Sequence, residues 1–432
     1  MALALRGLRQ LAGLEVLDRY GLRDATERLV HRGTRGGMRA AGAASRSFSA
    51  ASERLSRPAR QAPRRPADLF DLTPDEEQRM LQAAFRGFAA AQVRPAAREA
   101  DDAAETPGRI LAQSAELGTL VLAIPEELGG VVGERSTVTS VLAAEALAHG
   151  DLGIAVACLA PAAVATAISL FGDADQQSTY LPAFAGETPP AAAFAVTEPR
   201  ALFDPFELRT RARRDGDDLV LDGEKSLVPL ARTAELFLVA VDLEDAGPAM
   251  VLIESSTAGV TVTPEPAMGI RPAATGRLHL DGVRVPATAV VGAGGRAVYA
   301  EAIQRARLGW CAVSVGTAKA VLDYVTPYVN ERHAFGEPIS HRQSVAFAVA
   351  DIAVELEGMR LATYRAASLA DRGKDIGRAV ALARTLCAEK GMDIGSTGVQ
   401  LLGGHGYVKE HPVERWYRDL RAVGALEGAL LL

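Results

Sequence analysis

Cysteine and aromatic residues are scarce in this sequence, and two common nucleotide-binding motifs are missing. Aromatic side chains make up 5% of the 432 residues, and there are three cysteines and seven histidines. Cys158, Cys311 and Cys387 are far apart and lie in apolar helical surroundings, which predicts buried free thiols. The histidines show no metal-ligand spacing, so we expect no metal site. No GxGxxG turn follows a strand and no GxxxxGKS/T loop occurs, which argues against Rossmann-type and P-loop sites.

Long uninterrupted apolar runs are also lacking. Charged residues or proline break them before the ~20 residues that a membrane-spanning helix needs, so we expect no membrane span. The net charge of −6 gives no reason to expect nucleic acid or an anionic membrane as a partner. With 48% hydrophobic and 23% charged residues, the composition is globular, and the length predicts more than one domain.

The charge is unevenly distributed along the chain. Residues 1–66 contain 14 Arg, no Lys and 5 acidic residues, a net charge of +9, so the remainder carries −15. An Arg-rich N-terminus resembles a mitochondrial transit peptide, but transit peptides avoid acidic residues, and four of them lie between Glu15 and Glu27. We therefore favour a cytoplasmic, bacterial extension over a mitochondrial matrix protein. Residues 45–66 are polar and proline-containing, which predicts a linker.

Helical patterns dominate residues 67–191. Thr73 is placed to cap a helix, Pro74 suits the first helical position, and acidic residues fill the first turn. Residues 109–118 and 137–170 continue the helical pattern, and a turn interrupts it at 124–130. We expect these residues to form an N-terminal helical domain.

The pattern changes at residue 192 and again at 293. Short apolar or alternating segments bounded by Gly, Asp and Pro predict an antiparallel β domain over 192–292, with strands near 219–221, 236–241, 250–253, 259–262 and 277–280. From 293 to 432 the chain returns to helices, expected at 297–327, 341–370 and 375–398. Because helices and strands are segregated, the fold class is α+β and not a βαβ arrangement.

Six motifs, in order, resemble the acyl-CoA dehydrogenase family from about residue 70 to the C-terminus. They are IPEELGG at 124–130, FAVTEP at 194–199, VRVP at 283–286, RHAFG at 332–336, QLLGGHGY at 400–407, and RD at 418–419 followed by LEG at 426–428. The resemblance implies an N-terminal helical domain, a middle antiparallel β domain and a C-terminal four-helix bundle.

The resemblance also implies a reaction, the α,β-dehydrogenation of an acyl-CoA thioester. A carboxylate base removes the α-proton while the β-hydrogen leaves as hydride to a flavin. Glu427 lies where the family commonly keeps this base, and the alternative position is occupied by Ala306. The N–H of Glu427 is the expected donor to the thioester carbonyl, and Gly428 is expected beside the substrate. Arg307 resembles a helix arginine near the acyl-CoA, with an interhelix or intersubunit salt bridge as the alternative.

FAD is the cofactor that the resemblance implies, shared across a subunit interface. The neighbouring subunit contacts its diphosphate and adenine half, where arginine suits the charge and glycine lets the backbone approach. The residues expected to bind FAD are Thr197, Arg332, Phe335, Gln343, Gln400, Gly403 and Gly404. A homo- or hetero-oligomer is expected, with electron-transfer flavoprotein as the electron acceptor.

The residues around the expected flavin ring differ from the family pattern. Arg200-Ala201-Leu202-Phe203-Asp204 replaces the family's G-A-G-S-D, Leu227-Val228-Pro229 replaces W-I-T, and Ala429 replaces a threonine. Three hypotheses therefore stay open: a self-sufficient dehydrogenase, a subunit that completes the FAD site of a partner chain, and an acyl-CoA-binding module without redox chemistry.

Overall fold

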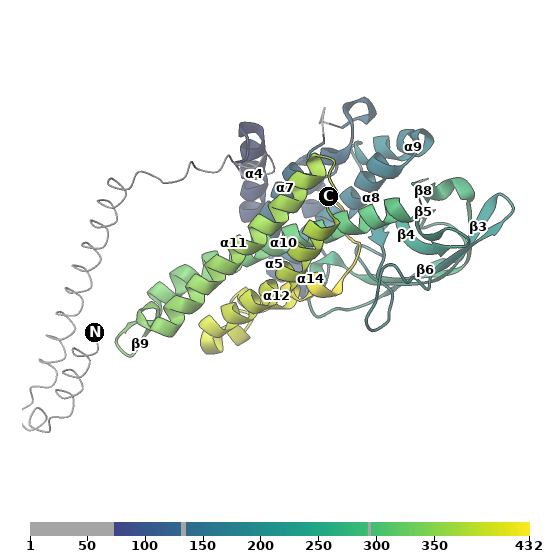
Figure 1. The fold of residues 1–432 in the computed structure, drawn as a ribbon. Helices are drawn as coiled ribbons and strands as arrows, with labels where there is room; N and C mark the ends of the chain where they lie inside the picture. Colours follow the sequence, from purple (N-terminus) through teal and green to yellow (C-terminus); the bar gives the residue numbers. More distant parts are fainter. Residues whose placement is uncertain (1–72, 131–134, 293–294) are drawn as a thin grey trace, which may run out of the picture. The chain divides into compact units, whose positions relative to one another are not determined.

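The computed structural model describes residues 73–130, 135–292 and 295–432, so the basic extension 1–66 lies outside it. The first described region is helical, as Figure 1 shows. Its α-helices are α4 (Glu76–Phe88), α5 (Arg94–Ala103), α6 (Gly108–Glu116), α7 (Thr137–Gly150), α8 (Leu152–Phe171) and α9 (Ala174–Phe184). A π-helical turn, Ala89–Val93, joins α4 to α5.

The first helix begins two residues later than the sequence suggested. Asp75, and not Thr73, is the N-cap: its carboxylate accepts the backbone N–H of Gln78 at 2.8 Å, and the Gln78 side chain accepts the N–H of Asp75. This reciprocal pair is a capping box, which satisfies two of the N–H groups that a helix start leaves without partners.

α8 is the exception to the expected interruption of apolar runs. Its 20 residues are long and apolar enough to cross a membrane, but 83% of its most apolar stretch is buried inside the protein. Pro161 lies within the helix and does not end it. The helix therefore serves as a core helix, packed against β1 and against the loop around Pro272, whose ring approaches Gly153.

The middle region is a mixed sheet in the order β6-β7-β3-β2-β4-β5-β8, with β1 also paired to β4. The strands are β1 (Ala192–Ala195), β2 (Arg211–Asp215), β3 (Asp218–Val228), β4 (Leu236–Leu243), β5 (Gly247–Glu254), β6 (Val260–Pro264), β7 (Gly276–Pro286) and β8 (Val290–Val291).

All five predicted strands form, but the sheet is not purely antiparallel. β1 and β2 lie along one edge of β4 and both pair with it in parallel, while the other pairs are antiparallel. The sequence of β2, RARRD, gave no strand signal because only Ala212 is buried.

Three long helices form the C-terminal region: α10 (Arg296–Glu331), α11 (Gln343–Asp371) and α12 (Gly377–Leu401). They follow the predicted ranges closely. The short helices α13 (Val413–Leu420) and α14 (Ala422–Ala425) come next, and α7 packs along α10 and α11. All three cysteines are buried free thiols, as predicted, and burial raises the pKa of Cys158 to about 12.

The last residues connect the helices to the sheet. Gly428 forms a bridge to Ala195 at the end of β1, and the N–H of Ala429 donates to Phe194 O at 2.9 Å. Trp310 on α10 donates its indole N–H to Gly428 O at 2.9 Å. Leu430, Leu431 and Leu432 are buried, so this tail is packed between α10 and the sheet and fixes the position of Glu427.

Candidate active site

Glu427 and Arg307 form a direct ion pair. Arg307 Nε lies 3.0 Å from each carboxylate oxygen of Glu427, and its Nη2 lies 2.8 Å from Oε1. This two-pronged contact is the geometry that arginine and carboxylate favour. Burial alone would lower the pKa of Arg307, but the bonds and charge of Glu427 outweigh it and raise that pKa. The structure thus joins two residues that are 120 positions apart in the sequence.

A second guanidinium, from α12, adjoins the same carboxylate. Arg384 Nη2 lies 3.7 Å from Glu427 Oε1 and also donates to the carbonyl of Leu426. Burial lowers the pKa of Arg384, and the charge of Glu427 partly opposes that shift. Sequence reasoning missed Arg384. Its only signal was an arginine within the small and apolar run ALARTLCA.

Thr197 hydrogen-bonds to the backbone on both sides of Glu427. Its hydroxyl accepts the N–H of Glu427 at 3.1 Å and donates to the carbonyl of Glu427 at 3.0 Å. The group expected to polarise the thioester is therefore engaged within the chain in this structure. We call Thr197, Arg307, Arg384 and Glu427 the buried junction, because all four belong to one cluster between β1, α10, α12 and the tail.

Gly428 has a structural requirement of its own. Its φ is +72°, and a Cβ there would lie 2.5 Å from Val196 Cγ2. Only glycine accepts this backbone angle and this close approach without strain. Its carbonyl is taken by Trp310, so the expected role of Gly428 beside the substrate stays a prediction.

A buried polar network supports the strand end that carries Thr197. The carboxylate of Glu198 accepts the N–H of Arg209 and of Thr210 and the hydroxyl of Thr210, at 2.8–3.0 Å. Lys225, fully buried, donates to Glu198 Oε1 at 3.0 Å and to Val196 O at 3.2 Å. Burial lowers the pKa of Lys225 to about 8. Because buried charges need such partners, the network holds the TEP segment in one place.

The six candidate FAD-binding residues other than Thr197 lie at the other end of the helical bundle. They come from the end of α10, the hairpin of β9 (His333–Ala334) and β10 (Glu337–Pro338), the start of α11, the end of α12 and the 3₁₀ turn Gly403–Tyr407. The β9 label marks the hairpin in Figure 1. We call this set the open end: Arg332, Phe335, Gln343, Gln400, Gly403 and Gly404, all outside the core.

The open end suits a cofactor that approaches from outside the chain. Phe335 is 94% exposed, and the guanidinium of Arg342 lies 5.6 Å from the centre of its ring. No atom lies within 4 Å of a Cβ built on Gly403 or Gly404, so backbone is accessible there. An aromatic face, arginines and bare backbone fit the adenine and diphosphate of FAD.

The two ends are far apart in one chain. Arg307 and Arg332 are 25 residues apart along α10 and its C-cap, which at 1.5 Å per residue corresponds to about 37 Å. The open end is thus not a neighbour of the same chain's Glu427.

The segment expected against the flavin ring offers few polar groups. Leu227 has φ +54°, which costs a non-glycine residue strain, and its N–H is already bound to Glu265 Oε2 at 2.7 Å. Pro229 has no N–H. In the loop that replaces G-A-G-S-D, Leu202 is fully exposed and Arg200 stacks over Phe203. The residues present therefore fit the distal half of FAD better than its ring.

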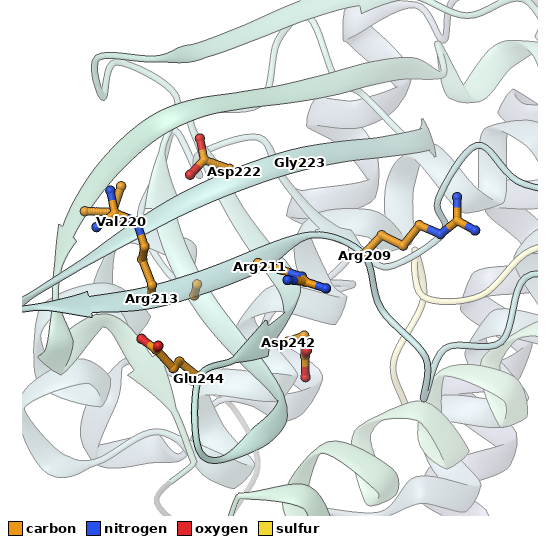
Figure 2. A pocket seen from close by; sticks show the side chains of 9 residues that line it. Arg209, Arg211, Arg213, Val220, Asp222, Gly223, Asp242 and Glu244 are labelled. Atoms are coloured by element: carbon orange, nitrogen blue, oxygen red, sulfur yellow. The ribbon is translucent and has the colours of Figure 1, made fainter.

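A groove of about 700 Å³ lies on the β domain, outside the buried junction (Figure 2). In register, Arg211 on β2 lies opposite Asp222 on β3 and Asp242 on β4. Three arginines, including Arg209 and Arg213, and three carboxylates, including Glu244, line it. Opposite charges facing each other across neighbouring strands stabilise a sheet, and this balance gives the groove no preference for an anion.

Comparison with known proteins agrees with the fold and the motifs. Models of the acyl-CoA dehydrogenase N-terminal, middle and C-terminal domains match residues 75–188, 193–283 and 293–430. The chain therefore belongs to the acyl-CoA dehydrogenase family. These are FAD-dependent oxidoreductases of acyl-CoA thioesters, and FAD-dependent acyl-CoA dehydrogenation is the activity of this chain.

Relatives and solved structures cover most of the chain. A probable acyl-CoA dehydrogenase of Bacillus subtilis is 32% identical over 83% of this chain and 96% of its own length. The short/branched chain specific acyl-CoA dehydrogenase of Bos taurus mitochondria is 31% identical over 82% of this chain and 83% of its own.

Two structures illustrate the likeness in three dimensions. A glutaryl-CoA dehydrogenase from Mycobacterium smegmatis, in complex with FADH2, has a TM-score of 0.75 at 26% identity, covering 82% of this chain and 91% of its own. A chain from work on the electron transferring flavoprotein of Acidaminococcus fermentans has a TM-score of 0.77 at 28% identity, covering 82% and 95%.

Proposed function

We propose that Glu427 is the base that removes the α-proton of the acyl-CoA thioester. The observation that carries this is its position in the buried junction, where the tail, α10 and the end of β1 meet. Among the described residues, its carboxylate is the one paired with Arg307. A base needs a fixed carboxylate within reach of its proton, and the tail provides one through Gly428 and Ala429.

In the structure, the contacts of the buried junction are made within the chain, and catalysis requires an exchange of partners. The bound thioester displaces Arg307 from the carboxylate of Glu427. The carbonyl oxygen of the thioester also replaces the Thr197 hydroxyl as the acceptor of the Glu427 N–H. Glu427 then receives the α-proton and becomes neutral. Arg307, no longer paired, supplies positive charge near the enolate oxygen. FAD, when bound, accepts the β-hydrogen as hydride.

Glu427→Gln tests this proposal directly. The amide keeps the size of the side chain but cannot accept the proton. We expect acyl-CoA-dependent bleaching of the flavin to slow by at least about 100-fold, with FAD content unchanged. Bleaching at the wild-type rate would remove Glu427 from the mechanism.

A second candidate is that this chain works as one subunit of a heteromeric dehydrogenase. The non-polar segment Leu227–Pro229, the exposed Leu202 and the intact open end favour it. In that case Arg332, Phe335 and Gln400 of this chain would contact an FAD that is bound mainly by a partner chain. Purification of this chain alone, then with a co-encoded dehydrogenase-like chain, distinguishes the two. About one FAD per chain alone supports a complete enzyme, whereas FAD acquired only with the partner supports the heteromer.

We further propose electron-transfer flavoprotein as the acceptor and the bacterial cytoplasm as the location. The acceptor is supported by the structural likeness to a chain studied with such a flavoprotein, and the location by the relative in Bacillus subtilis. Rapid reoxidation of the reduced enzyme by electron-transfer flavoprotein, with slow reoxidation by O₂, is the expected result. The reverse order would indicate an oxidase.

A further inference from the structure

Arg384 lies beside the proposed base and, unlike the arginine of an ordinary surface salt bridge, is mostly buried. Its side chain is 12% exposed and Glu427 is 11% exposed. Among the described residues, Glu427 is the one carboxylate paired with Arg384 within 4 Å. Nη2 donates to the carbonyl of Leu426, the residue before the base, while Nη1 is buried and has no hydrogen-bond partner within residues 73–130, 135–292 and 295–432.

Burying a guanidinium with an unused donor costs free energy. An apolar side chain at this position of α12 would avoid that cost, since neighbouring Ala383 and Cys387 are fully buried. The arginine thus needs a compensating role. The contacts of Arg384 indicate this role, because both are made with the segment Leu426–Glu427, which carries the carboxylate.

The two arginines of the buried junction have different freedom. Arg307 is 27% exposed, and in the described part of the chain its hydrogen bonds go to the carboxylate of Glu427 alone, so a thioester can take its place. Arg384 approaches the same oxygen, Oε1, but is less exposed, and it also hydrogen-bonds to the backbone carbonyl of Leu426. When Arg307 moves, Arg384 still holds Leu426 and one oxygen of Glu427.

We propose that Arg384 is a positioning residue for the catalytic base: it keeps the Leu426–Glu427 segment in place while Arg307 exchanges Glu427 for the substrate. This inference rests on the proposed role of Glu427. Small displacements of a reacting group cost large factors in rate, so loss of Arg384 acts on the proton-transfer step and leaves substrate binding largely intact.

The test compares Arg384→Met, Arg384→Lys and Arg378→Gln in the FAD-loaded enzyme, with its partner chain if FAD requires one. Arg378 is exposed on the same helix and is the matched control. For Arg384→Met we expect kcat to fall by about 100-fold with KM changed less than about threefold. The kinetic isotope effect with α-deuterated acyl-CoA should rise, since removal of the α-proton becomes more limiting.

Arg384→Lys keeps the charge, but its shorter side chain does not bring an ammonium to the position of Nη2, the nitrogen that contacts both Leu426 O and Glu427 Oε1. It should lose about tenfold in kcat, also with a raised isotope effect. If Arg384→Met does not fold, Arg384→Lys decides: wild-type kcat and isotope effect would overturn the proposal. A purely structural role would instead lower FAD content or thermal stability and leave kcat per bound FAD unchanged, as we expect for Arg378→Gln.

Glu427→Gln, measured in parallel, separates the two proposals. If it remains active, both the base and its positioning residue are wrong. If it is inactive while Arg384→Met turns over normally, only the role of Arg384 is wrong.

Discussion

The buried junction and the open end are built from the same helices in opposite ways. At the buried junction, charges meet charges within the chain and the backbone of Glu427 is hydrogen-bonded to Thr197. At the open end, an aromatic ring is exposed and two glycines face empty space. Buried charges need partners, and among the described residues the contacts of the buried junction supply them except at Arg384 Nη1, whereas exposed apolar and cationic groups indicate a binding surface.

This contrast fits the proposal that one chain contains a base at one end and contributes to a second site at the other. The buried junction is complete in a single chain, apart from cofactor and substrate. The open end lies about 37 Å away along α10, and we propose that the flavin of another chain binds there.

The largest expected effect is on activity, when the base at the buried junction and the FAD-binding residues at the open end are inactivated in separate chains. Glu427→Gln disables the buried junction, and the double variant Arg332→Gln, Phe335→Ser disables the open end. In a homo-oligomer, each variant alone should be nearly inactive. After mixing and reassembly, random pairing should restore about one quarter of wild-type activity, in sites that combine an intact base with an intact open end. Activity rates and FAD content of the mixtures measure this.

The same mixture sharpens the choice between a homomer and a heteromer. If this chain works beside a different dehydrogenase-like chain, mixing its two variants restores nothing. The open-end variant then lowers the FAD content of the partner chain instead. Full activity of the double variant alone would contradict the assignment of the open end, because these residues would then have no part in the FAD site.

A smaller effect, on stability, is expected at Asp419. This residue of the Arg418-Asp419 motif is fully buried, and Oδ1 accepts the N–H of Ile270 at 2.6 Å. Asp419→Ala leaves that N–H unpaired and should cost about 2–4 kcal/mol in the free energy of unfolding. Asp419→Asn keeps the acceptor, and Oδ2 has no hydrogen-bond partner in the part of the chain that the structure describes, so the substitution should cost less than about 1 kcal/mol. Urea unfolding measures both.

The same residue predicts a pH dependence. Burial, with the charge of Asp151 next, raises the pKa of Asp419 to about 8, from 3.8 for the ordinary group. Between pH 3.8 and about 8, the Asp419 carboxyl is therefore protonated in the folded state and ionised in the unfolded state. Its contribution to stability is fully present below pH 4 and is lost as the pH rises through 8. The difference in unfolding free energy between wild type and Asp419→Asn should change over that window. A constant difference would contradict the raised pKa.

The sequence predicted the order of the three regions and named as candidates the six residues of the open end and three of the four residues of the buried junction, because periodicity and local motifs are properties of short segments. It did not predict β2, whose five residues bury only Ala212. It also missed Arg384, since nothing local shows that α12 places this side chain beside Glu427. The Thr197–Glu427 and Arg307–Glu427 contacts join residues 230 and 120 positions apart, and only tertiary packing reveals them. The domain boundaries 67–191, 192–292 and 293–432 stay predictions.

The smallest expected effect is a matched pair of glycine substitutions, one at each end. Gly428→Ala places a methyl 2.5 Å from Val196 Cγ2 at φ +72°, so it should cost about 1–3 kcal/mol of stability through overpacking and strain. Gly404→Ala meets no atom within 4 Å and has no positive φ. It should leave the unfolding free energy within about 0.5 kcal/mol of wild type and weaken FAD binding instead, since the methyl occupies the approach to the backbone. Thermal unfolding without FAD measures the effect on stability, and FAD titration of the assembled protein measures the effect on FAD binding. Equal loss of stability in both variants would show that the open end is packed within the chain, and the contrast between the ends would then fail.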